Sequence, residues 1–173
     1  MTARLPPLAL LLGLGGLLPF LACGLGSVTA GGAVPADRAL LALIEYDAII
    51  LSFLGAVHWG FALGAPAPDR AATATTIAAA WLAGADRVRL ALGVLPALLG
   101  WAALLVSVAA APAIALALLI AGFLATTVVE ARAARDGLVP AGYMQMRWLL
   151  TLIVVLVLTL VLLSRISGIA VHL

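Results

Sequence analysis

Residues 43–63, LIEYDAIILSFLGAVHWGFAL, decide the fold of this chain. The stretch is mostly apolar and as long as a helix must be to cross the hydrocarbon core of a bilayer, about 20 residues. It nevertheless carries Glu45, Asp47 and His58. A charged side chain at the bilayer centre costs roughly 2.5–3.5 kcal/mol even on the lower scales. Three ionisable groups on one span therefore make it the first place to look for a site.

The composition extends this interpretation to the whole chain. Hydrophobic residues make up 66% of the 173 residues and charged residues 9%, against about 25% charged in a typical soluble domain. We therefore predict an all-α fold, a polytopic membrane helix bundle that forms a single domain over residues 1–173. All nine basic residues are Arg, a bias typical of GC-rich bacterial genomes, and the net charge is only +2. Scattered arginines of this kind do not indicate nucleic-acid binding.

Five apolar segments are long enough to cross the membrane, and we predict transmembrane helices at residues 8–28, 39–63, 88–108, 112–129 and 148–163. Pro19 and Pro96 lie inside two of them and predict kinks, because proline removes a backbone donor. Residues 71–83 are apolar but too few for a span, so they are expected to form a short interfacial or re-entrant helix. Arg147 and Arg165 bracket the last span as interface anchors, and Tyr143 is expected in the aromatic belt.

The arginines also predict the orientation. If the chain crosses the membrane five times, seven arginines lie on one side of the membrane and only Arg38 and Arg165 lie on the other. Because cytoplasmic loops are enriched in basic residues, we expect a bacterial inner-membrane protein with a cytoplasmic N-terminus and a periplasmic C-terminus. Cys23 follows an apolar run, which resembles a lipoprotein signal. The membranous sequence after it favours an uncleaved first helix with an incidental cysteine.

Small residues follow one face of the second span. Ala48, Ser52, Gly55 and Ala56 form a stripe that ends at Trp59. Small residues at this spacing allow two helix backbones to approach closely. We therefore expect this helix to be the most enclosed of the five.

The ionisable residues of the same span have two interpretations. Asp47 and His58 are eleven residues apart, so they share a helix face but lie about 16 Å apart along the axis. In the functional interpretation they and Glu45 belong to a proton or ion path, or His58 binds haem. In the structural interpretation, which we favour, the carboxylates lie near the interface bonded to Arg38 or water, and His58 satisfies a buried acceptor.

The sequence gives little support for a haem site, a metal cluster or a catalytic triad. His172, the second histidine, is expected near the opposite face from His58, which argues against a bis-histidine haem site. A single cysteine excludes an intramolecular disulfide and a cysteine-based metal cluster. A Ser52, His58 and Asp47 triad fails on geometry, because Ser52 points away from the other two on a straight helix. We therefore predict no catalytic residues, no cofactor and no metal site.

Three stretches carry a family resemblance: ILSFLGAVHWGFAL at residues 50–63, RLALGVLPALLGWAALL at residues 89–105 and ARAARDGLVPAGYMQMR at residues 131–147. In this order, with the apolar last helix, they resemble a family of small bacterial membrane proteins related to the transmembrane-protein-69-like proteins of mitochondria. Residues 71–83 look like an insertion. The resemblance implies a helical inner-membrane protein without an assigned activity, and it supplies no site residues.

Two functions remain open at this point. The first is a non-enzymatic accessory or assembly factor of a membrane complex, which would bind the bilayer and a membrane-protein partner; self-association is left open. The alternative is a small transporter or proton-coupled carrier that uses His58 with Glu45 and Asp47. The residues expected to carry either role are Glu45, Asp47, Ser52, Gly55, His58 and Trp59.

Overall fold

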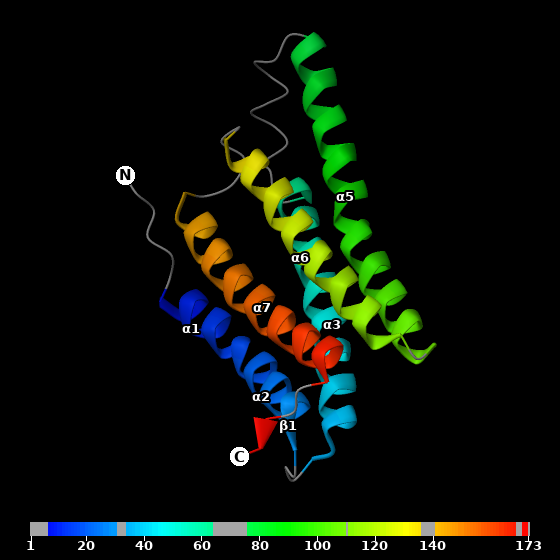
Figure 1. The fold of residues 1–173 in the computed structure, drawn as a ribbon. Helices are drawn as coiled ribbons and strands as arrows, with labels where there is room; N and C mark the ends of the chain where they lie inside the picture. The colour runs from blue at the N-terminus through cyan, green and yellow to red at the C-terminus, as the bar shows by residue number, and fades with distance from the viewer. Residues whose placement is uncertain are drawn as a thin grey trace.

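The computed structural model describes residues 7–30, 34–63, 76–109, 111–135, 141–168 and 171–172, with the side chains of residues 30, 61–63, 76–89, 141 and 171–172 left aside. Within this part the chain is a bundle of antiparallel helices (Figure 1). They are α1 (Pro7–Gly15), α2 (Leu17–Val28), α3 (Ala36–Leu63), α5 (Thr76–Val108), α6 (Pro112–Arg135) and α7 (Ala141–Ser167). The described residues contain five segments long and apolar enough to cross a membrane, so the expected helical membrane fold is confirmed.

The first span is interrupted, as Pro19 predicted. Helix α1 ends at Gly15 and α2 begins at Leu17, so that Pro19 stands in the first turn of α2, where proline is tolerated. The carbonyl of Gly16, at the interruption, accepts a hydrogen bond of 2.9 Å from the Tyr46 hydroxyl of α3. The interrupted span is thereby fixed to the neighbouring helix.

The prediction of a separate short helix at residues 71–83 is wrong where the structure describes it. Residues 76–83 are the beginning of α5, which runs without a break to Val108. The sequence explains this, because no proline occurs between residues 69 and 95 and the segment is rich in alanine, the strongest helix former. With 33 residues, α5 is about 50 Å long, longer than the hydrocarbon core of about 30 Å.

The small-residue stripe of α3 is the contact with α5. A Cβ at Gly55 would collide with the Gly93 carbonyl, and one at Gly100 would lie 2.9 Å from the Ala48 carbonyl. The backbones of the two helices therefore touch at two levels. Trp59 completes this contact, because its indole Nε1 donates a 3.0 Å hydrogen bond to the Leu90 carbonyl.

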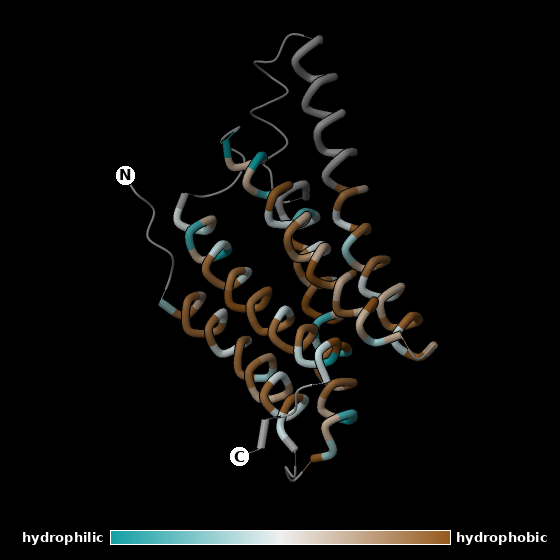
Figure 2. The backbone as a smooth tube through the Cα atoms, viewed as in Figure 1, coloured by the Kyte–Doolittle hydropathy of each residue, from teal (hydrophilic) through white to brown (hydrophobic). Residues whose placement is uncertain are grey.

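The core lies between α3, α6 and α7, with α2 on one side. Apolar residues make up most of the length of the described helices (Figure 2). Leu51 of α3 packs against Gly122 of α6, and Phe123 of α6 meets Phe20 of α2 edge to face. Equal shares of the α3 and α6 spans are buried, 39% each. The expectation that α3 alone is the most enclosed helix is thus only half correct.

At the C-terminal end of α7, Arg165 connects this helix to α2 and α3. Its guanidinium donates to the carboxylate of Asp37 over 2.8 Å and to the backbone carbonyls of Ser27 and Ala36. Next to it, β1 (Thr29–Ala30) pairs in parallel with β2 (Val171–His172). Asp37 is 89% exposed, so this end of the bundle carries a solvent-accessible ion pair; the role of Arg165 as an interface anchor stays a prediction.

Candidate functional site

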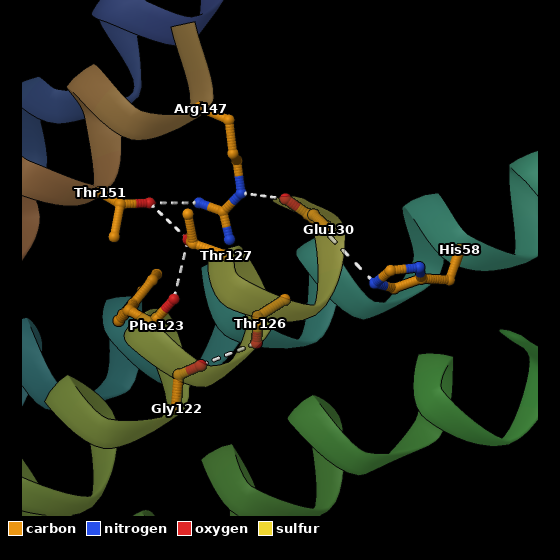
Figure 3. Close-up of polar contacts among 8 residues, drawn as sticks. All are labelled: His58, Gly122, Phe123, Thr126, Thr127, Glu130, Arg147 and Thr151. Atoms are coloured by element: carbon orange, nitrogen blue, oxygen red, sulfur yellow. Dashed lines mark hydrogen bonds and ion pairs between the residues drawn. The ribbon is translucent and has the colours of Figure 1, made fainter. Parts of the chain in front are cut away.

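Three helices bring ionisable side chains together at the opposite end of the bundle. His58 is on α3, Glu130 on α6 and Arg147 on α7 (Figure 3). The short connection between α6 and α7 places Glu130 and Arg147 opposite each other on antiparallel helices. We call these three residues, together with Thr127 and Thr151, the polar cluster.

The centre of the polar cluster is a buried ion pair. Arg147 Nε donates to Glu130 Oε2 over 2.6 Å, and Arg147 Nη1 donates to the Thr151 hydroxyl over 2.8 Å. Glu130 is fully buried and Arg147 is 4% exposed. Desolvation of two charges is compensated only where the geometry is good and further hydrogen bonds satisfy the remaining atoms. The threonine beside the guanidinium supplies one of these.

The threonines connect the ion pair to the helix backbones. The hydroxyls of Thr127 and Thr151 lie 2.9 Å apart, and Thr127 also bonds to the Phe123 carbonyl. Thr126 donates to the Gly122 carbonyl over 2.7 Å. The hydroxyls of Thr126 and Thr127 therefore bond back into α6, and that of Thr127 also reaches across to α7.

His58 is the member of the polar cluster that α3 contributes. Its Nε2 lies 3.9 Å from Glu130 Oε1, and the side chain is 5% exposed. It also lines a cavity of about 120 Å³ between α5 and α6 that Leu92, Pro96 and Thr126 share. Pro96 has no N–H to offer to the carbonyl of Leu92 four residues earlier, so one of the lining residues lacks its usual helical hydrogen bond. The contact with Glu130 agrees with the structural interpretation of His58.

Asp47 does not lie where the structural interpretation placed it. It is fully buried, and neither carboxylate oxygen has a hydrogen-bond partner among the described residues. The expected position near the interface, with a bond to Arg38, is therefore wrong for Asp47. The reason is the helical rotation, since Asp47 shares the inward face with Leu43 and Leu51 while Arg38 is exposed.

Glu45 lies on the other side of the same helix. Two residues turn an α-helix by about 200°, and Glu45 is accordingly exposed on the outside of the bundle. Its neighbours one turn away on this face are Leu41 and Ile49, which are 44% and 63% exposed. Glu45 is eight residues beyond Asp37, about 12 Å further along the axis. It is therefore a carboxylate on an apolar face, inside the span.

Among the expected site residues, only His58 joins the polar cluster. The Ser52 hydroxyl bonds to the Ala48 carbonyl of its own helix at 2.8 Å. Gly55 and Trp59 belong to the contact with α5. Within the described residues, no three His, Cys, Asp or Glu side chains are grouped so that they could hold a metal ion.

The ion pair was not predicted from the sequence. The fourth span was expected to end at residue 129, before Glu130, and Arg147 was expected to be an interface anchor, whereas the structure buries both side chains. Tyr143 was expected in the aromatic belt, whereas its side chain interacts with Glu130. A signal was present: Thr126 and Thr127 stand one turn before Glu130, and Thr151 one turn after Arg147. Such i, i+4 spacing forms a polar stripe on each of two helices joined by a short loop.

Comparison with known proteins assigns this fold to a family. The family model described as "Protein of unknown function (DUF3429)" matches residues 5–163, which include the whole polar cluster. The chain belongs to the DUF3429 family. A relative of this DUF3429 protein is transmembrane protein 69 of Xenopus tropicalis, 38% identical over 100 residues. The match covers 58% of the present chain and 33% of the frog protein, about a third of its length. No solved structure gives a significant match.

The family and the five apolar helices agree with the resemblance noted above. The DUF3429 protein is a multi-pass, helical membrane protein.

Proposed function

We propose that this DUF3429 protein is a non-enzymatic accessory or assembly factor of a complex in the bacterial inner membrane. The observation that carries the proposal is the position of Glu45, an exposed carboxylate between Leu41 and Ile49 on the outer face of α3. Acidic residues in membrane spans almost always face a bundle interior or pair with another group. A partner helix that brings an arginine or lysine to this face would supply the missing counter-charge.

The polar cluster supports the same proposal from inside the bundle. Glu130, Arg147 and the two threonines bond to one another and connect α6 with α7, while His58 adds α3. These side chains are used in helix association. The polar cluster does not use the outer face of α3, which is therefore available to a second protein in the membrane.

Co-purification tests the proposal. The full chain, tagged at its C-terminus, is extracted gently from its own membranes, and bound proteins are quantified by mass spectrometry for the wild type and for Glu45→Gln. We expect a stoichiometric membrane-protein partner that falls at least fivefold with Glu45→Gln. The matched control is Asp136→Asn, which removes a carboxylate outside the five spans and should retain the partner. A partner set unchanged by Glu45→Gln contradicts the proposal.

A second candidate, a proton-coupled carrier, is favoured by a specific observation. Asp47 is fully buried without a hydrogen-bond partner in the described part of the chain, on the face of α3 that also carries His58. An ionisable group inside a membrane bundle is a functional candidate by default. Reconstitution into liposomes that contain a pH-sensitive dye tests it. Proton flux that is lost in Asp47→Asn supports this candidate, and equal flux in the wild type and the variant contradicts it.

A further inference from the structure

A second cavity, lined by Arg147, is not used by the preceding functions. It measures about 160 Å³, and residues of α1, α2, α3, α6 and α7 line it. Its wall is almost entirely apolar and includes Gly13, Phe20, Phe53, Phe123, Arg147 and Thr151. A dry cavity of about 150 Å³ is sufficient to bind a benzene ring. The space is therefore large enough for a six-membered ring or a short acyl segment.

The cavity is accessible from the lipid side of the bundle. Leu12 and Phe53 belong to its lining and are 64% and 66% exposed. Gly13 of α1 and Gly16, at the break between α1 and α2, also line the cavity and bring no side chain into the space. A ligand could therefore enter from the bilayer, and its apolar tail could remain among the lipids.

Arg147, one of the residues that line this cavity, has a donor without a partner. Arg147 lines the cavity and is 4% exposed, and its Nη2 has no hydrogen-bond partner in the described residues. Its Nε and Nη1 are bonded to Glu130 and Thr151. Buried donors without a partner are rare in native structures, and each requires an explanation. A ligand oxygen would provide the missing acceptor.

We propose that this cavity binds a lipid-soluble molecule whose uncharged carbonyl oxygen accepts a hydrogen bond from Arg147 Nη2. The charge balance selects a neutral group, because Glu130 already neutralises the guanidinium and an added anion would stand uncompensated in an apolar site. The carbonyl belongs either to a membrane quinone or to the acyl ester of a lipid. This site does not depend on Glu45, so it can fail or succeed independently of the accessory role.

Binding of defined probes to the purified full chain in nanodiscs tests the site. The probes are a decyl-substituted benzoquinone, a short-chain diacylglycerol and decanoate, and their affinities are measured for the wild type and two variants. Ile50→Phe enlarges a side chain that lines the cavity. Arg147→Lys retains the charge opposite Glu130 but lacks the forked arrangement of donors. The matched control is Ile114→Phe on the outer face of α6, where Ile114 is 58% exposed.

We expect saturable binding of the quinone or the ester, weakened at least tenfold by Ile50→Phe and about fivefold by Arg147→Lys, and unchanged by Ile114→Phe. The probe that binds more tightly identifies the source of the carbonyl. Three results would each overturn the proposal: no saturable binding of either neutral probe, binding that Ile50→Phe leaves unchanged, and tighter binding of decanoate than of both neutral probes.

Discussion

At the scale of single residues, the structure separates three carboxylates by what surrounds them. Glu130 is buried and paired with Arg147 at 2.6 Å. Asp47 is buried without a hydrogen-bond partner among the described residues, and Glu45 is exposed on an apolar helix face. The same chemical group thus has a structural role at one position and is a candidate for function at the two others.

The ion pair predicts a large effect of removing one charge. Glu130→Gln leaves the Arg147 charge buried without compensation, which typically costs about 3–5 kcal/mol of folding free energy. We expect a loss of at least about 2 kcal/mol, since the amide oxygen can still accept one hydrogen bond. Reversible unfolding in mixed detergent micelles, followed by circular dichroism, measures the change.

The control for this variant is Arg132→Gln, an exposed charge on the same helix. We expect it to change the free energy of unfolding by no more than about 0.5 kcal/mol. Equal effects of the two substitutions would show that the buried pair does not stabilise the bundle.

At the scale of elements, the contact between α3 and α5 depends on the absence of side chains at three positions. Gly55 lies against Gly93, and Gly100 lies against Ala48, so that backbone meets backbone. In a bilayer, where lipid tails are as apolar as leucine, close van der Waals packing of this kind is a main source of helix association.

Two glycines of α3 allow a matched test of this contact. Gly55→Ala places a methyl group on the Gly93 carbonyl, and overpacking of this kind costs about 1–3 kcal/mol. Gly60→Ala meets nothing within 4 Å and replaces glycine by a better helix former, worth up to about 1 kcal/mol of stability. Unfolding free energies in micelles should therefore change in opposite directions. Similar destabilisation by both substitutions would contradict the packing seen here.

Trp59 provides a second prediction for the same contact. Trp59→Phe removes the hydrogen bond to the Leu90 carbonyl, so we expect a loss of about 1 kcal/mol of unfolding free energy. Trp101 is 60% exposed on α5, and Trp101→Phe should change stability by about 0.5 kcal/mol or less. Loss of stability in Trp101→Phe alone would reverse the roles assigned to the two tryptophans.

At the scale of the whole molecule, the two ends of the bundle differ in chemistry. One end carries the polar cluster of α3, α6 and α7, and the other is closed by Arg165 with Asp37 and by the pairing of β1 with β2. The five spans among the described residues put the start of α1 and the end of α7 at opposite ends of the bundle (Figure 1).

The arginine distribution predicts which end faces the cytoplasm. Green fluorescent protein fused after Arg135 should fluoresce, because the end of α6 is expected on the arginine-rich cytoplasmic side. The same protein fused to the C-terminus should remain dark, while alkaline phosphatase at that position should be active. The reverse pattern of fluorescence and phosphatase activity would invert the orientation.

The parts of the fold that the sequence predicted are those that depend on neighbours along the chain. The interruption of the first span and the small-residue contact of α3 followed from Pro19, Gly55 and Trp59, because proline and glycine act locally. The prediction of a separate helix at residues 71–83 was wrong for residues 76–83, which belong to α5. The segment was judged by its length alone, although no proline separates it from the apolar residues that follow.

The sequence by itself determined a membrane bundle of five helices, because a lipid solvent requires long apolar segments with internally satisfied backbones. Only the tertiary structure decided which ionisable residues meet. Glu130 and Arg147 are seventeen positions apart, and their pairing depends on how α6 and α7 are rotated against each other. Helix geometry alone puts Asp47 and Glu45 on opposite faces of α3, but which of the two faces inward was decided by the contacts of α3 with α2, α5 and α6.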